Sequence, residues 1–194
     1  MARVEAQGDA EVMRASIAEP DRFATLYDRY AGALYRYAHQ RVGPQAAQDV
    51  VAETFLAAFQ RRTAYDANRP EARPWLFGIL TRKLARYRRS ERADYRALSR
   101  SSVDTTIDGP ADVVAERVTA HAARAALGAA LAGLPARDRD VLLLVAWGEL
   151  SYEEVAAALG IPVGTVRSRL NRARRKVKES LGGVNPISAT EDDR

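Results

Sequence analysis

The chain has 194 residues, of which 47% are hydrophobic and 28% are charged. This length and composition fit one ordinary domain or two small ones with a packed core, and they exclude a disordered polyelectrolyte. Because the chain has no cysteine, it has no disulfide, no thiolate nucleophile and no cysteine-ligated zinc site. With only two histidines, His39 and His121, we expect neither a metal site nor a cofactor.

The positive charge of the chain is concentrated in two blocks. The formal net charge is +5, but residues 69–100 hold ten Lys/Arg against three Asp/Glu, and residues 162–181 hold seven against one. The rest of the chain is therefore acidic, which indicates two separate contacts with a polyanion. No run approaches the roughly 18 apolar residues of a membrane span, and acidic residues break the N-terminus. We expect a cytoplasmic protein without a signal peptide.

The first half of the chain divides into helical lengths, with no stretch that alternates with the period of a strand. We predict an all-α protein in which residues 1–20 form an N-terminal extension. The predicted elements of this half are a helix over 21–42, a helix over 45–61, a polar loop over 62–70, and a helix that starts at Pro70 or Pro74 and ends near residue 92.

A change in composition predicts a domain boundary in the middle of the chain. Residues 93–111 lose the apolar period and are rich in Ser and Thr, which indicates a flexible linker. Further helices are predicted over 112–132 and 136–147, with two more that end at residue 181, and residues 182–194 are predicted to be a disordered tail. The chain is thus predicted to hold two small helical domains, 21–92 and 112–181.

The end signals of a helix-turn-helix occur in order between residues 151 and 181. Ser151 and Glu154 form a capping-box pattern, Gly160 ends that helix, and Pro162 leads into a second helix with an apolar stripe. The side opposite the stripe, which a major groove would face, carries Thr165, Ser168, Asn171, Arg172 and Arg175. The flanks, where side chains usually meet phosphates, carry Arg167, Arg169, Arg174 and Lys176.

A basic helix alone is more often only a solvated face. Here an acidic capped helix, a turn with glycine and a basic amphipathic helix follow one another, and residues 136–161 hold two Lys/Arg against five Asp/Glu. This sorting of charge between neighbouring helices favours DNA contact by the second helix.

The basic block at the end of the third helix mixes Lys and Arg with aromatic residues. This composition suits opened or single-stranded DNA, because bases stack while the backbone is neutralised. The candidates are Tyr65, Arg82, Lys83, Arg86, Tyr87 and Arg89. Trp75 lies on the apolar stripe and is predicted to be core, and Tyr87 fits either role. The acids Asp49 and Glu53 have no His, Lys or metal-ligand cluster beside them in the sequence, so a solvated or protein-binding face is favoured over an acid–base pair.

Three stretches together resemble bacterial RNA polymerase sigma factors of the extracytoplasmic-function (ECF) type, in the sigma-70 family. Residues 49–55, Asp-Val-Val-Ala-Glu-Thr-Phe, resemble the clamp-binding helix of that family. Residues 73–79, Arg-Pro-Trp-Leu-Phe-Gly-Ile, resemble its promoter-melting helix, and residues 134–175 resemble its fourth domain. The resemblance implies sigma domain 2, a bundle of three to four helices, and sigma domain 4, a helix-turn-helix, joined by a flexible linker.

The resemblance also implies a role for each surface. It implies that Asp49 and Glu53 face the polymerase clamp, that the loop at 62–69 holds a base flipped from the minus-ten element, and that the helix through Arg89 stabilises the opened strand. The last helix would read the minus-thirty-five element as duplex, while the linker passes toward the active-site and RNA-exit channel of the polymerase. The implied partners are the clamp and flap of core RNA polymerase, promoter DNA, and an anti-sigma factor or other regulator. The factor would act as a monomer within the holoenzyme and would not itself be an enzyme.

Two positions depart from the family pattern. Ala52 stands where the family often has Gln, which weakens one clamp contact, and Arg82 stands where Asn is common, which puts a promoter-strand contact in doubt. The alternative from another class is an autonomous helix-turn-helix repressor or activator, with residues 1–111 as a sensing or dimerising domain. A small hydrolase that uses Asp49 and Glu53 is disfavoured.

Overall fold

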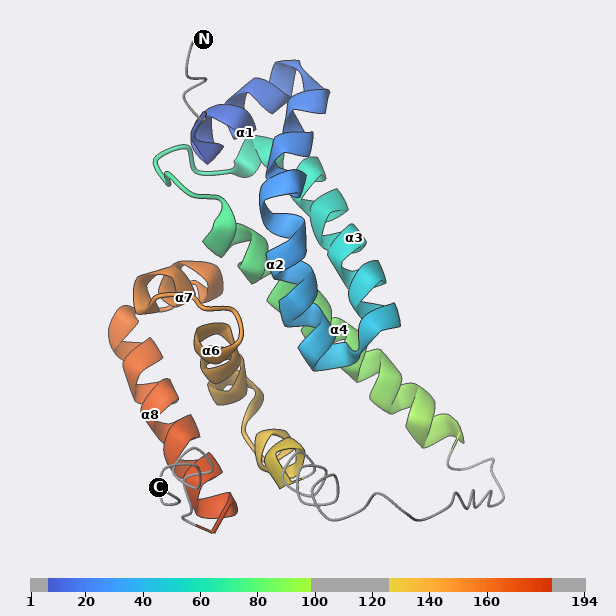
Figure 1. The fold of residues 1–194 in the computed structure, drawn as a ribbon, viewed down its shortest axis with the longest axis vertical. Coiled ribbons are helices and arrows are strands. Elements are labelled where there is room, and N and C mark those ends of the chain that lie inside the picture. The colour runs from blue at the N-terminus through green and yellow to red at the C-terminus, as the bar shows by residue number, and fades with distance from the viewer. Residues whose placement is uncertain (1–6, 99–125, 183–194) are drawn as a thin grey trace, which may run out of the picture.

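The computed structural model describes residues 7–98 and 126–182. Every regular element in these two ranges is a helix, which confirms the predicted all-α fold (Figure 1). The first range contains α1 (Asp9–Ala18), the short 3-10 helix η1 (Pro20–Phe23), α2 (Ala24–Val42), α3 (Pro44–Gln60), the 3-10 helix η2 (Arg62–Ala64) and α4 (Arg73–Leu98). The second range contains a helical segment over 126–132, followed by α6 (Ala136–Ala146), α7 (Tyr152–Leu159) and α8 (Val163–Ser180).

Helices α2, α3 and α4 pack against one another as a three-helix bundle. Gly43 ends α2 with a φ of 79°, a left-handed value that favours glycine, and Pro44 starts α3 at once because its fixed φ suits a first helical turn. The rings of Tyr37 and Phe77 meet edge to face, with centroids 5.4 Å apart, in the middle of the bundle. The fully buried side chains of the bundle include Leu26, Leu34, Tyr37, Leu76, Phe77, Leu80 and Leu84.

The N-terminal extension predicted over residues 1–20 contains a helix, α1, which the sequence analysis missed. Val12 and Met13 on this helix are each 2% exposed and belong to the hydrophobic core. An isolated helix of ten residues is marginal in water. Packing against η1, α2 and η2 therefore stabilises α1, and a local pattern could not reveal that packing.

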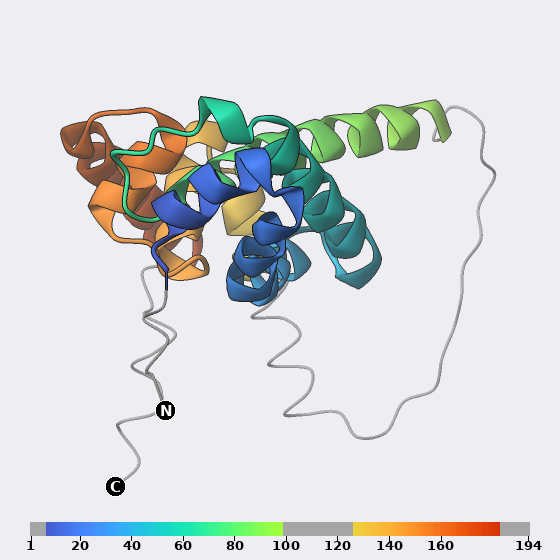
Figure 2. The ribbon, with the colours of Figure 1, turned by 90° about the horizontal axis from the view of Figure 1, so that it is seen from above.

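Helix α4 is longer than predicted. It continues to Leu98, six residues into the range predicted as a linker. No glycine or proline occurs between Gly78 and Gly109, so no residue of the helix-ending kind stops it at the predicted boundary. Figures 1 and 2 show that the C-terminal half of α4 projects beyond the rest of the bundle. Residues 99–111, most of the helix predicted over 112–132, and residues 183–194 lie outside the described ranges.

The C-terminal helices pack on each other and on the bundle. Helix α6 contacts α8, α7 contacts both, and α7 also lies against α4. Val155 of α7 and Leu170 of α8 belong to the same contiguous hydrophobic cluster as Leu76 of α4. The two units therefore share one core in this arrangement. Within the part of the chain that is described, no helix is long and apolar enough to cross a membrane.

Candidate nucleic-acid interface

The turn between α7 and α8 has the geometry that the sequence predicts for a helix-turn-helix. The Ser151 side chain accepts a hydrogen bond from the Glu154 backbone N–H at 3.1 Å, and the Ser151 N–H donates to the Glu154 carboxylate at 2.7 Å. This is a complete capping box, so two of the free N–H groups at the start of α7 are satisfied. Gly160 ends α7 in the left-handed conformation at φ 65°, and Pro162 precedes the first turn of α8.

One side of α8 is buried and the opposite side is open. Val166, Leu170 and Ala173 are at most 1% exposed and hold α8 on the core. The exposed residues among those predicted to meet DNA are Arg167, Ser168, Asn171, Arg172, Arg174, Arg175 and Lys176, while Thr165 and Arg169 are half-buried at the edges. The structure thus brings the predicted minus-thirty-five residues together on one helix. Their contacts with DNA stay a prediction.

The segment between α3 and α4, residues 61–72, forms a loop that is braced from within. The Tyr65 hydroxyl donates to the Arg69 carbonyl at 2.8 Å, and the Tyr65 ring meets Trp75 edge to face at 5.3 Å. Tyr65 is only 8% exposed; burial, followed by the nearby charge of Asp9, raises its pKa to about 12. In this structure Tyr65 supports the loop from inside, and direct stacking of its ring on a base stays a prediction.

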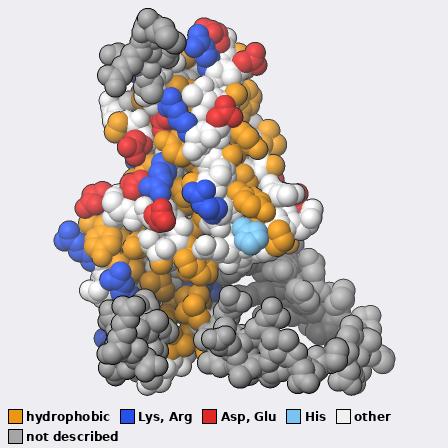
Figure 3. Space-filling model, viewed as in Figure 1, with side chains coloured by type: hydrophobic (Ala, Val, Ile, Leu, Met, Phe, Trp, Pro, Cys, Tyr) orange, Lys and Arg blue, Asp and Glu red, His pale blue; other side chains and the backbone are white. Residues whose placement is uncertain are grey.

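The basic residues predicted to meet the opened strand lie along α4. Arg82 and Arg86 are exposed, whereas Lys83 and Tyr87 are half-buried, and Tyr87 packs against the core. The side chain of Arg89 lies outside the described part. Figure 3 shows basic and acidic side chains intermixed on the face where α7 meets the beginning of α4, so that face is not a basic surface.

The acidic pair on α3 is exposed as predicted. Asp49 and Glu53 lie four residues apart on the outer side of the helix, and Leu56, one turn further on, is 57% exposed. Glu53 also forms an ion pair with Lys83 of α4 at 2.8 Å. The described residues contain no group of three or more His, Cys, Asp or Glu side chains placed to hold a metal ion. The combination of a charged, partly apolar face with no metal cluster suits protein contact.

Comparison with known proteins identifies the family. The Sigma-70 region 2 family matches residues 26–93, and the Sigma-70, region 4 family matches residues 124–177. The ECF RNA polymerase sigma factor SigL of Mycobacterium tuberculosis is 35% identical over 175 residues, which cover 89% of this chain and 96% of SigL. The chain belongs to the ECF RNA polymerase sigma factors. SigW of Bacillus subtilis, another ECF RNA polymerase sigma factor, is 28% identical over 170 residues, 84% of this chain and 90% of SigW.

Solved structures resemble this sigma factor along most of its length. CnrH, solved in complex with the cytosolic domain of CnrY, matches with a TM-score of 0.62 at 27% identity, over 92% of this chain and 100% of CnrH. The sigma factor RpoE of Bartonella quintana, solved in complex with the anti-sigma factor NepR, shares the fold with a TM-score of 0.57 at 24% identity, over 82% and 96% of the two chains. As an ECF sigma factor, the protein binds core RNA polymerase and directs promoter-specific transcription initiation. The alternative of an autonomous repressor is not favoured.

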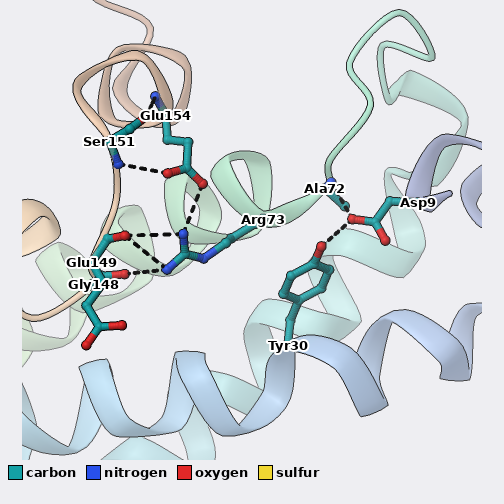
Figure 4. A network of polar contacts seen from close by, with 8 residues as sticks. All are labelled: Asp9, Tyr30, Ala72, Arg73, Gly148, Glu149, Ser151 and Glu154. Atoms are coloured by element: carbon teal, nitrogen blue, oxygen red, sulfur yellow. Dashed lines mark hydrogen bonds and ion pairs between the residues drawn. The ribbon is translucent and has the colours of Figure 1, made fainter.

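The residues that join the two halves of the sigma factor were not predicted from the sequence. Arg73, at the start of α4, donates to the Gly148 carbonyl at 2.8 Å and to the Glu149 carbonyl at 3.3 Å, and pairs with Glu154 at 3.1 Å (Figure 4). These carbonyls follow α6, where a cation is stabilised by the free C=O groups of the helix end. The partners lie 75 to 81 residues away in sequence, so no local signal could have revealed them.

A second ion pair and a close helix crossing complete this junction. Arg41, on α2 and 7% exposed, donates to Asp140 of α6 at 2.8 Å. Where α4 crosses α7, a Cβ atom built on Gly78 would lie 2.4 Å from the Ala158 carbonyl oxygen, so only glycine allows this approach. The close packing of α4 on α7 therefore holds the two halves together in the arrangement described.

Proposed function

We propose that this sigma factor reads the two promoter elements with two surfaces and docks on the polymerase clamp with a third. Residues 21–92 act as sigma domain 2 and residues 112–181 as sigma domain 4, with a linker between them. The loop 61–72 and the basic side of α4 act on the minus-ten element, α8 reads the minus-thirty-five element, and the α3 face with Asp49 and Glu53 meets the clamp.

The observation that carries the proposal is the geometry of α8 after its turn. Its buried side fixes the helix on α6 and α7, while its open side presents exposed polar and basic side chains of the types that bind base edges and phosphates. In a helix-turn-helix this second helix enters the major groove of duplex DNA. The same protein also carries a basic α4 beside an exposed loop, which supports a second contact with opened DNA.

The clamp-docking face is supported by its mixed character. Leu56 gives an apolar centre next to the acids Asp49 and Glu53, and the ring of Tyr27, 50% exposed, packs at a tilt against that of Phe55 with centroids 4.8 Å apart. Apolar anchors with charged neighbours are typical of protein interfaces. Because Glu53 pairs with Lys83 in the structure described, a basic partner that binds Glu53 would release Lys83 for DNA.

The remaining features of the proposal follow from the family. The protein itself catalyses no reaction, since the polymerase performs the chemistry, and it works in the cytoplasm where polymerase and chromosome meet. A separate regulator, an anti-sigma factor, clamps the two domains and hides both basic surfaces. The complexes solved for CnrH with CnrY and for RpoE with NepR support such a partner.

Run-off transcription with purified core polymerase tests the proposal. On fragments of the native genome, the wild-type protein is expected to produce discrete new start sites, because it supplies the promoter contacts that core polymerase lacks. The double variant Asp49→Ala/Glu53→Ala is expected to lose most of this activity and its affinity for core polymerase.

The matched control is Glu71→Ala, which removes an exposed acid from the loop side of the molecule and not from α3. It is expected to keep wild-type affinity for core polymerase. Tight binding of the wild-type chain to duplex DNA, with no new start sites in the presence of core polymerase, would contradict the proposal.

A further inference from the structure

One buried carboxylate ties the N-terminal helix to the loop 61–72. Asp9, in the first turn of α1, is 5% exposed. Its carboxylate accepts hydrogen bonds from Arg29 Nη1 at 2.7 Å, from the Tyr30 hydroxyl, and from the Ala72 backbone N–H at 2.8 Å. Figure 4 shows Asp9 between Tyr30 of α2 and Ala72. A buried carboxylate with three donors from other segments is a strong and specific anchor.

Ala72, which the Asp9 carboxylate holds, lies at the junction of the loop with α4. Ala72 is the last residue of the loop and precedes α4, and its carbonyl accepts the first bond of that helix from the Leu76 N–H at 2.9 Å. Asp9 therefore fixes the point at which the loop ends and α4 begins. Arg29 strengthens the anchor, because its other terminal nitrogen donates to the Gln7 carbonyl at 2.7 Å.

The opposite end of the loop is held by the other end of α1. Arg62 donates to the Ser16 carbonyl at 3.1 Å and to the Phe59 carbonyl at 2.8 Å, and its guanidinium lies 4.0 Å from the centre of the Phe59 ring. Asp9 and Ser16 are seven residues apart on one helix, which separates them by about 10 Å along its axis. Because both ends of the loop are bound to α1, this helix sets the distance between them.

Between these ends the loop presents an exposed tip. Residues 66–71 are exposed, while Tyr65 and Ala72 on either side are buried. The Asn68 N–H donates to the Asp66 carboxylate at 3.1 Å, so the tip has a turn of its own. A loop held this way loses little conformational entropy when it binds a ligand, which raises both affinity and selectivity.

We propose that Asp9 is a positioning residue for minus-ten recognition: through Ala72 it holds the loop in the shape that selects the extruded base. This inference rests on the proposed role of the loop in holding that base. Asp9 itself lies beneath the loop and does not touch DNA. Its loss is expected to change which minus-ten sequences are used, beyond any change in the amount of initiation.

The test compares Asp9→Asn with Glu11→Gln, an exposed acid on the same helix. The side chain of Asn keeps the size of Asp but has no charge and only one acceptor oxygen, so it cannot accept from Arg29 on one side and from Tyr30 and the Ala72 N–H on the other. Transcription is measured on a set of promoters with single substitutions in the minus-ten element, together with affinity for core polymerase and the thermal midpoint of unfolding. In Asp9→Asn the preference for the best minus-ten sequence over its substituted forms is expected to fall about tenfold, with core affinity within about twofold of wild type.

Tyr30→Phe keeps the Asp9 carboxylate and removes one of its hydrogen-bond donors. It therefore replaces Asp9→Asn in the test if Asp9→Asn does not fold. It is expected to lower the preference to a value between those of Asp9→Asn and wild type. An unchanged minus-ten preference in Asp9→Asn or, if that variant is unfolded, in Tyr30→Phe would overturn the inference. The inference would also be overturned if transcription and core affinity fell in equal proportion while the minus-ten preference stayed unchanged. Such a result would mean that Asp9 has a purely structural role.

The double variant Asp66→Ala/Asn68→Ala separates this inference from the function on which it rests. If this change at the exposed tip leaves the minus-ten preference unchanged while the protein still initiates, the loop does not hold the base and both proposals fail. If the tip variant changes the preference and Asp9→Asn does not, the loop role stands and only the positioning by Asp9 is overturned.

Discussion

Two tyrosines of the sigma factor are held at sites where their neutral form is favoured. Burial raises the pKa of the Tyr30 hydroxyl, and its hydrogen bond to the Asp9 carboxylate raises it further. Burial likewise raises the pKa of Tyr65 to about 12, with the charge of Asp9 as the next cause. Tyr65 belongs to the loop 61–72, and Tyr30 contacts the Asp9 carboxylate that anchors this loop, so the protonation of both hydroxyls affects the same region.

These shifts predict a loss of stability in alkali. In the unfolded chain a tyrosine loses its proton near pH 10, whereas folded Tyr65 keeps its proton up to about pH 12. Within that window the unfolded state binds fewer protons, so the free energy of unfolding falls as the pH rises. Urea unfolding at pH 9, 10 and 11 measures the slope, which is expected to be shallower in Tyr65→Phe and Tyr30→Phe.

Tyr27, 50% exposed, provides the control for this experiment. Tyr27→Phe is expected to leave the slope of stability against pH at the wild-type value. If the slope of stability against pH is as steep in Tyr65→Phe and Tyr30→Phe as in the wild type, other groups cause the loss of stability in alkali.

At the scale of elements, α7 has a helix start that is capped by side chains on both sides of its first turn. Its capping box satisfies two backbone groups reciprocally, and the Glu154 carboxylate that completes it also pairs with Arg73 through its second oxygen. One side chain therefore supports both the helix-turn-helix and its contact with α4. The start of α7 is for this reason coupled to the packing of the two halves.

Removal of the cap is expected to have a moderate effect on stability. Ser151→Ala is predicted to lower the free energy of unfolding by about 1 kcal/mol and the thermal midpoint by about 3 °C, as expected for a chain of this size. Calorimetry measures both. Ser180→Ala, at the exposed end of α8, is the matched control and is expected to change stability by less than about 0.5 kcal/mol. A loss that is equal in both variants would contradict the role of the cap.

The elements that the sequence predicted well are those whose signals are local. Ser151, Glu154 and Gly160 lie within ten residues of one another, so their pattern is visible without any tertiary structure. The anchor at Asp9 was missed because its partners lie 20, 21 and 63 residues away. The composition of its segment predicted that Tyr65 meets opened DNA, and this stays a prediction, whereas its contacts with Trp75 and Arg69 inside the loop were not predicted.

At the scale of the whole molecule, the two halves share a core, and this conflicts with simultaneous contact at both promoter elements. The minus-ten and minus-thirty-five elements are named by their positions relative to the transcription start. They therefore lie about 25 base pairs apart, which is about 85 Å along straight duplex DNA. A compact chain of this length has a radius of gyration of only about 16 Å. If the two halves read the two elements as proposed, the junction of α4 with α7 must open before one molecule reaches both.

A side chain at Gly78 is expected to open this junction. In Gly78→Ala the added methyl group meets the Ala158 carbonyl oxygen, so α4 and α7 are forced apart. Small-angle X-ray scattering is expected to show a larger radius of gyration than wild type, with the helical circular dichroism retained.

Gly32→Ala is the matched control, because Gly32 also lies within a helix and its nearest contact, the Arg36 side chain, is an ordinary 3.6 Å away. Both substitutions raise helix propensity by up to about 1 kcal/mol, but only the first adds a clash. An unchanged radius of gyration in Gly78→Ala would mean that the junction tolerates the methyl group.

The ion pair between α8 and α6 bears on how this protein searches a chromosome. Arg172 Nη1 lies 3.4 Å from both carboxylate oxygens of Asp138, whose side chain is 3% exposed. One terminal nitrogen of this arginine therefore already has an acceptor within the protein. A chromosome offers roughly a million or more non-specific sites, which attract basic helices through phosphates alone. To engage Arg172, any DNA site must compete with a buried carboxylate, so the contact with DNA gains less than it would if this arginine had no internal acceptor. If Arg172 contacts DNA as proposed, Asp138 is therefore expected to weaken the binding of α8 to incorrect DNA and to leave more of the protein free to find its promoters.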